Sequence, residues 1–386
     1  MEQLSKYRMA RRAYGLDEIA LVPDRTTVDV DDVDISATIG SVKLAVPIIG
    51  SAMDGVVDAR MAVHLSELGA VGVLNLHGVQ TRYENPDAVL EKIASVSTTE
   101  YVELMQKIYQ EPVKEFLIAK RIKEIKSNGG YAVGSTIPQD AVKFGQLVAK
   151  AGGDALLVQS TVVSVEHFSA RYNALDLEKL AKDLSISVWV GNCTTYDTAL
   201  SLMKTGVSAV FVGVGPGAAC TSRGVLGIGV PMATAIADAA AARTDFLRDT
   251  GKYVAVVADG GIVTGGDVCK AIACGADAVM MGSPIAKAAE APGRGFHWGM
   301  ATPNATLPRG TRINVGTIGT IKTIIQGPAV CDDGTQNFVG SLKTSMGTLG
   351  ARSIKEMHSV PIIIAPSLQT EGKVYQKAQK LGMYHK

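Results

Sequence analysis

The feature that most constrains the fold is a rhythm of eight short apolar runs, each followed by polar or glycine residues and a helical pattern. The runs are continuous and rich in β-branched residues, as expected for strands buried on both faces of a parallel sheet. Strands alternating with helices indicate β/α units, and eight units favour a closed (β/α)8 TIM barrel over an open doubly wound sheet. The predicted strands are 47–50, 70–74, 131–134, 155–158, 188–190, 209–212, 254–258 and 278–281.

Residues 1–45 precede this rhythm. They contain an apolar stretch, 18–23, and alternating stretches near Val28 and Val42. We expect these to form short strands ahead of the barrel that close its bottom. The helices predicted within the rhythm are 140–151, 196–204, 233–243 and 266–274.

Two segments interrupt the rhythm. Residues 79–128 are charged and helical in pattern, and we expect a packed helical connection that is too short for a second domain. Residues 291–365 begin with a glycine-rich, weakly periodic stretch. A long irregular segment in a compact domain is usually functional or disordered, so we expect a flap over the barrel mouth with a C-terminal insertion. The whole chain, 1–386, is predicted to be one barrel domain.

Charge and cysteine content narrow the classes of partner. Lys and Arg total 38 against 37 Asp and Glu, and the two signs are interspersed, which argues against a nucleic-acid or anionic-membrane partner. Five cysteines without a C-x-x-C pair argue against a disulfide framework or a zinc site and indicate a reducing compartment. The sequence has no apolar run of about 20 residues and no apolar leader. We therefore expect a cytoplasmic protein.

Polar and glycine residues follow seven of the eight predicted strands. Because the carboxyl ends of barrel strands share one face, and active sites of such barrels lie there, we expect these residues to gather at the mouth. They are 51–54, 75–78, 159–161, 191–194, 213–223, 259–261 and 282–283.

The loop after the sixth strand is glycine-rich and presents one thiol, Cys220, followed by Thr221, Ser222 and Arg223. A thiolate is a nucleophile, and neighbouring hydroxyls and a cation favour it. Free cysteine is also among the most buried residue types. The local sequence therefore leaves two interpretations open, a catalytic nucleophile or a structural thiol, whereas Cys269 and Cys274 fit a buried helix face.

The turns after the last two strands are typical of a phosphate site. Glycine N–H groups and a helix N-terminus there can hold an anion. Asp259 suits a carboxylate that grips ribose hydroxyls; its alternative role, capping the helix near Gly266, is better suited to Asp267. The G-x-G of the cysteine loop is not a dinucleotide fingerprint, because the third glycine is missing. Together these pieces predict a nucleoside monophosphate facing a cysteine, whose adduct can lose hydride to a nicotinamide and then be hydrolysed.

At this point the sequence resembles the IMP dehydrogenase and GMP reductase family. The resemblance rests on SAMD at 51–54, GPGAACTSRGVLGIGVP at 215–231, ADGGIVTGGDVCKAIACGADAVMMGS at 258–283 and AEAPG at 289–293. It extends to Trp298 and to a late helix within 341–357. The resemblance implies a TIM barrel, a homotetramer or octamer, IMP and NAD as partners, and Cys220 as the nucleophile on purine carbon 2.

The resemblance also implies roles for other residues. Ser222 stands where the family has a threonine beside the reacting carbon, next to Thr221. His297 stands where dehydrogenases have a phosphate-binding tyrosine. The nucleotide-binding positions are Ser51, Met53, Asp259, Gly260, Gly261, Gly282, Ser283, His297, Gly299 and Met300. The cofactor positions are Gln159, Ser160, Asn192, Gly213 and Gly215. Carbonyls of Gly215, Gly217 and Cys220 match a loop that binds a monovalent cation such as K+.

The departures from the family pattern leave the activity open. Full-length dehydrogenases carry a pair of CBS modules where this chain has only 79–128, so it resembles a short branch of the family. The Arg-Tyr pair that activates water is missing from the flap, and Arg309 and Arg312 remain as candidates. The reductase's flap glutamate is also missing. Gln159 replaces an aspartate that meets the cofactor, and Met232 replaces a glutamine.

Three functions follow as hypotheses. The first is an NAD-dependent IMP dehydrogenase, in guanine nucleotide synthesis. The second is a GMP reductase using NADPH, because C-T-S-R resembles the reductase's C-T-T-R. The third is a non-catalytic purine nucleotide sensor, because the flap is short. For His77 and His167 we expect structural or surface roles.

Overall fold

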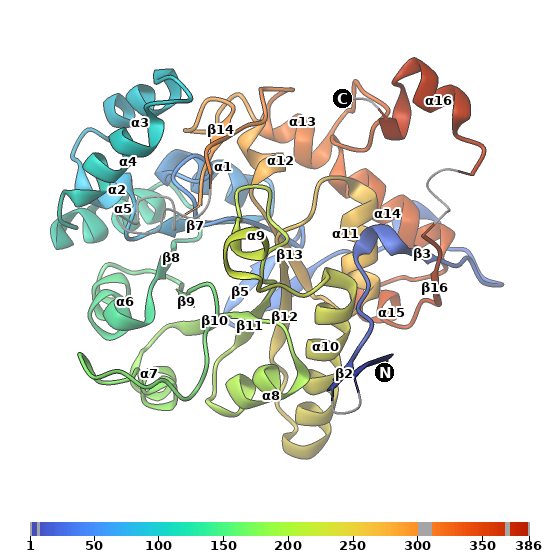
Figure 1. Ribbon diagram of the computed structural model, residues 1–386, viewed down its shortest axis with the longest axis horizontal. Helices are drawn as coiled ribbons and strands as arrows, with labels where there is room; N and C mark the ends of the chain where they lie inside the picture. Colours follow the sequence, from blue (N-terminus) through green and yellow to red (C-terminus); the bar gives the residue numbers. More distant parts are fainter. Residues whose placement is uncertain (1, 6–7, 300–310, 367–370, 385–386) are drawn as a thin grey trace.

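The computed structural model describes residues 2–5, 8–299, 311–366 and 371–384. Eight parallel strands close into a barrel in the order β6 to β13, which confirms the predicted (β/α)8 fold (Figure 1). Every predicted run forms one of these strands, with small shifts at the ends. They are β6 (Ile48–Gly50), β7 (Val71–Asn75), β8 (Val133–Thr136), β9 (Ala155–Gln159), β10 (Ser187–Cys193), β11 (Ala209–Val212), β12 (Ala255–Asp259) and β13 (Ala278–Met281).

Helices surround the barrel (Figure 1). The predicted helix 196–204 matches α8 residue for residue, whereas α10 runs past the predicted end at 243 to Thr250. The extra turns bury Phe246, and the helix ends at Gly251 in a left-handed conformation that glycine favours. The barrel helices are α1 (Ala59–Glu67), α6 (Ala141–Lys150), α7 (Leu177–Asp183), α8 (Tyr196–Lys204), α9 (Ser222–Leu226), α10 (Met232–Thr250), α11 (Gly265–Ala273) and α12 (Ser283–Ala286).

The bottom of the barrel is closed by a hairpin of β4 (Ala37–Ile39) and β5 (Val42–Leu44). Ile39, Val42 and Leu44 are fully buried and belong to the cluster of inward-facing strand residues. In that cluster Trp189 and Phe211 stack with ring centroids 5.9 Å apart. The stretch near Val42 therefore closes the bottom as predicted.

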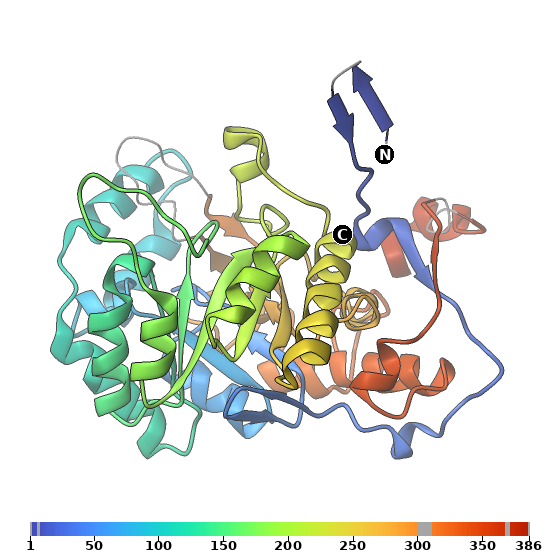
Figure 2. The same cartoon turned by 90° about the horizontal axis from the view of Figure 1, so that it is seen from below.

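The other two N-terminal stretches behave differently from the prediction. Residues 18–23 contain β3 (Ile19–Leu21), which pairs antiparallel with β16 (Ile362–Ile364) on the outside of the barrel. The stretch near Val28 is not a strand: its N–H donates to the carbonyl of Gly347, so this segment covers the end of a late helix. Figure 2 shows the first hairpin, β1 (Glu2–Ser5) with β2 (Arg8–Ala10), projecting away from the body.

Residues 79–128 form four helices between β7 and β8. They are α2 (Val79–Arg82), α3 (Pro86–Ser95), α4 (Tyr101–Gln110) and α5 (Glu115–Ser127). Their small core consists of Val79, Leu90, Ile93, Met105 and Ile108, together with Trp298. Trp298 belongs to the segment after the last barrel strand, so the helical connection packs on the start of the predicted flap.

Within 291–365, only the first part has the form of a flap. Two short strands, β14 (Phe296–His297) and β15 (Ile313–Asn314), pair antiparallel. Beyond them α14 packs against α11 with Phe338, Leu342 and Met346 buried, so this part belongs to the outer layer of the barrel. The remaining elements are α13 (Ile321–Gln326), α14 (Phe338–Thr348), α15 (Ile354–Met357) and α16 (Val374–Gln379), and four short 3-10 turns, at Leu16–Glu18, Val30–Asp32, Pro138–Asp140 and Gly382–Tyr384.

Candidate active site

Three strand ends meet at the carboxylate of Asp259, the last residue of β12. Its Oδ2 accepts hydrogen bonds from the amide groups of Gln159, at 2.9 Å, and Asn192, at 2.8 Å. The Gln159 amide also donates to Asn192 Oδ1 at 3.0 Å. The sequence predicted that these residues share the mouth, and the structure joins them directly through hydrogen bonds.

The environment of Asp259 favours its neutral form. Burial raises the pKa of Asp259 to about 6, although the amides of Asn192 and Gln159 oppose the shift. The carboxylate does not cap α11: that helix begins after Thr264, and Thr264 and Asp267 cap each other's backbone. The helix is thus capped by Asp267 and not by Asp259, as predicted from the sequence, and Asp259 is available for another role at the mouth.

Cys220 is the exposed cysteine of the mouth. Its N–H donates to the Gly217 carbonyl at 2.9 Å, and its thiol donates to Ser222 Oγ at 3.3 Å. Ser222 is buried at the start of α9, and Thr221 directly precedes that helix. Cys193 and Cys269, by contrast, are buried, and burial raises the pKa of their thiols to about 12 and about 11. Exposure removes the argument for a structural thiol at Cys220.

The cysteine loop lies directly on the turn that follows Asp259. Gly213 adopts φ +146°, and a Cβ there would stand 2.2 Å from the Asp259 carbonyl oxygen. Cβ atoms at Gly260 and Gly261 would lie 3.2 and 3.0 Å from the Pro216 ring. These close approaches explain the glycines. They also place the loop that carries Cys220 against Asp259, whose carboxylate is predicted to bind the ribose hydroxyls.

Arg223 braces this loop. The Arg223 side chain packs against two glycines. A Cβ on Gly215 would lie 2.7 Å from Arg223 Cγ, and a Cβ on Gly229 would lie 2.6 Å from the same atom. Its guanidinium donates to the carbonyl of Val230 at 3.3 Å. Its observed role is thus to hold the loop's shape, which differs from the role predicted for it as a cation that favours the thiolate.

The predicted phosphate end lies between the neighbouring strands β6 and β13. A Cβ at Gly282 would lie 3.1 Å from the sulfur of Met53 and 3.7 Å from Ser51 Oγ. Ser283 Oγ and His297 Nε2 are hydrogen-bonded at 2.9 Å. Burial lowers the pKa of His297 to about 4, so its ring is neutral at pH 7. The five residues predicted for this part of the site are thus neighbours.

The flap supplies fewer described residues. Gly299 borders the cysteine loop, since a Cβ on it would lie 3.9 Å from the Ala219 carbonyl oxygen. Met300 and Arg309 lie outside the described residues. Their predicted roles stay predictions.

Arg312, a candidate water activator, binds the end of α3. Its guanidinium donates to the carbonyl of Val96 at 2.9 Å and to that of Ile93. It also lies over the rings of Phe296, at 4.6 Å, and Tyr101, at 5.2 Å. These contacts direct it toward the helical connection, so a role in water activation stays a prediction.

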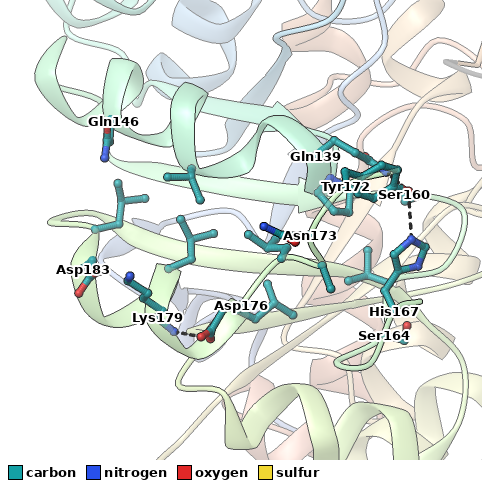
Figure 3. A pocket seen from close by; sticks show the side chains of 18 of the residues that line it. Gln139, Gln146, Ser160, Ser164, His167, Tyr172, Asn173, Asp176, Lys179 and Asp183 are labelled. Carbon is teal, nitrogen blue, oxygen red and sulfur yellow. Dashed lines mark hydrogen bonds between the residues drawn. The ribbon is translucent and has the colours of Figure 1, made fainter. Parts of the chain in front are cut away.

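A cavity of about 600 Å³ opens beside Ser160, between α6 and the loop leading to α7. Figure 3 shows His167 and Tyr172 at one end of it. Their rings stack with centroids 5.6 Å apart, and the Tyr172 hydroxyl is 3.0 Å from both His167 Nε2 and the Gln139 amide. This cavity could not be predicted from the sequence, because no motif marks residues 161–176.

His77 has a structural role, as expected. Its Nε2 lies 2.9 Å from Thr136 Oγ1 and 3.3 Å from the N–H of Ile137. Burial lowers the pKa of His77 to about 4. The neutral ring thus ties the end of β7 to the end of β8.

A second set of contacts was not expected from the sequence. The Tyr109 hydroxyl of α4 donates to Asp54 Oδ2 and accepts from the Trp298 indole at 2.8 Å. Burial raises the pKa of Asp54 to about 6. Asp54 directly follows Met53, so the connection, the nucleotide-binding turn and the flap share one buried network. Tyr109 is one of two tyrosines in α4, and no motif marks it for such a role.

Among the described residues, no group of three or more His, Cys, Asp or Glu side chains could hold a metal ion. This finding concerns side chains, so it does not test the predicted cation site, which consists of backbone carbonyls. Nor is any helix in the described ranges both long and apolar enough to cross a membrane.

Known proteins resemble this chain over nearly its whole length. Residues 13–374 match the family model for the IMP dehydrogenase / GMP reductase domain. An uncharacterized oxidoreductase of Mycobacterium leprae is 37% identical, over 95% of this chain and 100% of the relative. An inosine-5'-monophosphate dehydrogenase of Methanocaldococcus jannaschii is 26% identical, over 95% and 96%. The crystal structure of an IMP dehydrogenase/GMP reductase-like protein from Corynebacterium glutamicum is 33% identical, with TM-score 0.89, over 94% and 97%.

Proposed function

The chain belongs to the IMP dehydrogenase / GMP reductase family of oxidoreductases, and from this premise we propose that it oxidises IMP to XMP with NAD. The observation that carries the proposal is the exposed thiol of Cys220 on a loop packed against Asp259. A nucleophile and a ribose-binding carboxylate at one barrel mouth suit a covalent reaction on a nucleotide base.

The nucleotide is proposed to lie across the mouth. Its ribose hydroxyls donate to Asp259, whose Oδ1 accepts no hydrogen bond from the described residues, whereas Oδ2 accepts two. Its phosphate lies at the turns of Gly261 and Gly282, next to Ser283. Its purine then faces Cys220. The neutral ring of His297 still carries one N–H, so His297 joins the hydroxyl of Ser283 and backbone N–H groups as the phosphate's proposed partners.

The proposed reaction balances as IMP, NAD and water giving XMP, NADH and a proton. The Cys220 thiolate adds to C2 of the purine, and the hydrogen on that carbon leaves with its electron pair. Water then attacks C2 and displaces the sulfur, so that oxygen replaces hydrogen and the thiol is regenerated. NAD, when bound, supplies the acceptor for the hydride. Ser222, 3.3 Å from the sulfur, accepts the thiol hydrogen bond and orients the sulfur.

The residues proposed to hold NAD fit its chemistry. The side-chain amides of Gln159 and Asn192 already use both of their N–H groups on Asp259, Asn192 Oδ1 and the Gly213 carbonyl, so they offer their oxygens as acceptors to the N–H groups of a carboxamide. The cavity beside Ser160 has room for the adenosine half, and its stacked His167 and Tyr172 rings suit an aromatic base (Figure 3).

Further parts of the proposal rest on the family alone. They are a homotetramer or octamer, a cytoplasmic location, a role in guanine nucleotide synthesis, and a monovalent cation such as K+ on the carbonyls of Gly215, Gly217 and Cys220. Water activation is assigned to Arg309 or Arg312. GMP reductase with NADPH is the second candidate, favoured by the C-T-S-R sequence at 220–223.

One assay tests the proposal. Purified protein is mixed with IMP and NAD, then separately with GMP and NADPH, and the absorbance of the reduced nicotinamide is followed. A rising signal in the first mixture supports the dehydrogenase. A falling signal in the second identifies a reductase, and silence in both contradicts an enzymatic role and favours a nucleotide sensor.

A further inference from the structure

We propose that the helical connection positions the nucleophile: Tyr101 of α4 acts through Thr311 and the Ala219 carbonyl to hold the backbone next to Cys220. The contacts form a continuous chain. The Tyr101 hydroxyl is 2.9 Å from Thr311 Oγ1, and the Thr311 N–H donates to the Ala219 carbonyl at 3.0 Å. Ala219 immediately precedes Cys220 in the sequence.

Arg312 strengthens the first link. Its guanidinium binds the carbonyl of Val96 at 2.9 Å, at the end of α3, where the helix dipole favours a cation. It also lies over the rings of Tyr101 and Phe296, at 5.2 and 4.6 Å from their centroids. Cations over aromatic faces are attracted by the ring quadrupole. Arg312, the residue after Thr311, is therefore held by both α3 and α4.

The other side of the flap is held by the same helices. Trp298 is buried in the core of the connection, and its indole donates to Tyr109 of α4. The next residue, Gly299, also borders the Ala219 carbonyl. Thr311 and Gly299 thus both reach the Ala219 carbonyl, and the residues beside them are held by the connection, Arg312 by the end of α3 and Trp298 by α4. In Figure 1 these helices stand beside β14.

A positioning role for α4 and a purely structural role lead to different expected results. Packing alone makes the flap and connection stable together and leaves the thiol unaffected. Positioning requires that a change in α4 alters the reactivity of Cys220 while stability and nucleotide affinity stay nearly constant. The kinetic part of the inference rests on the proposed function, but the thiol reactivity does not.

The test substitution is Tyr101→Phe, which removes the hydroxyl and keeps the ring beneath Arg312. The matched control is Tyr83→Phe, because the Tyr83 hydroxyl bonds the Ile108 carbonyl at 2.9 Å within the same connection and has no described contact with the flap. Cys220 alkylation by iodoacetamide is timed by mass spectrometry of its peptide. Turnover and thermal unfolding are measured in parallel on the full chain.

For Tyr101→Phe we expect the alkylation rate of Cys220 and kcat to change by about fivefold, with KM for the nucleotide within about twofold, because one hydrogen bond is lost. Tyr83→Phe should leave alkylation and kcat unchanged. Thr311→Val, which removes the same bond from its other end, should add little to Tyr101→Phe in the double variant. The inference is overturned if Tyr101→Phe leaves the alkylation rate unchanged, or if both tyrosine variants alter it equally. If no substrate pair gives turnover, the proposed function fails while the alkylation result still decides this inference.

Discussion

The two ends of the barrel are built from opposite kinds of residue. At the bottom, Ile39, Val42 and Leu44 are buried among inward-facing strand residues. At the mouth, a carboxylate and two amides bond one another beside an exposed thiol. The bottom gains stability from burial, whereas the mouth keeps a carboxylate whose pKa burial raises to about 6. The difference indicates that stability resides at one end and chemistry at the other.

The largest expected effect is at the thiol. Cys220→Ala should lower turnover by a factor of about 10⁴ or more, because it removes the nucleophile. The midpoint of thermal unfolding should hardly move, because the side chain is exposed. The control is Cys331→Ala. Cys331 is partly exposed and its thiol donates a hydrogen bond to Asp333, and its substitution should leave activity unchanged. Turnover that survives in Cys220→Ala removes the covalent mechanism.

A substitution at the bottom should show the reverse pattern. Leu44→Ala should cost about 2–5 kcal/mol of unfolding free energy, because it leaves a cavity in the closed end. At a temperature where the variant stays folded, kcat should remain near the wild-type value. Denaturant unfolding and steady-state kinetics check both. A loss of kcat without a loss of stability would contradict the division between the two ends.

Asp259→Asn should weaken nucleotide binding by about tenfold to a hundredfold, because a carboxylate accepts ribose hydroxyls more strongly than an amide does. The same change tests the pH dependence. The carboxylate must be ionised to accept both hydroxyls, so kcat/KM should rise between pH 5 and pH 7 in the wild type, around the pKa of about 6. This rise of kcat/KM should be smaller in Asp259→Asn. It should not vanish, because the phosphate of the substrate titrates in the same pH range. An unchanged rise would assign the pH dependence to the phosphate.

The last expected effect concerns stability against pH and comes from the same side chain. The pKa of Asp259 is raised from 3.8 to about 6 in the folded chain, so the folded state binds the proton more tightly. Its contribution therefore favours folding below pH 4 and is lost as the pH rises to 6. Asp259→Asn should make the chain more stable than the wild type at pH 7 by about 1–3 kcal/mol, and less so at pH 4. Unfolding curves at both pH values check this, and equal differences would contradict it.

The sequence predicted what depends on local periodicity. All eight barrel strands and α8 follow from apolar runs and turn residues between them. The partner of β3 was not predictable, because β16 lies more than 300 residues away and neither pattern encodes the pairing. The bounds of α10 also depended on tertiary burial of Phe246.

For the site, the motifs located Cys220, Asp259 and Ser283 and left their partners open. That Gln159 and Asn192 bond the same carboxylate oxygen requires the curvature of the barrel, which no motif contains. Nor did the sequence connect Tyr101 to Thr311, 210 positions apart. Long-range polar contacts leave no periodic trace in a single sequence.

The most direct test of the central claim is a crystal structure of the protein soaked with IMP. We predict that purine C2 lies in contact with Cys220 Sγ while the ribose hydroxyls bond Asp259 and the phosphate lies at Ser283. A nucleotide held elsewhere, for example in the cavity beside Ser160, or a sulfur turned away from the purine, would contradict the account.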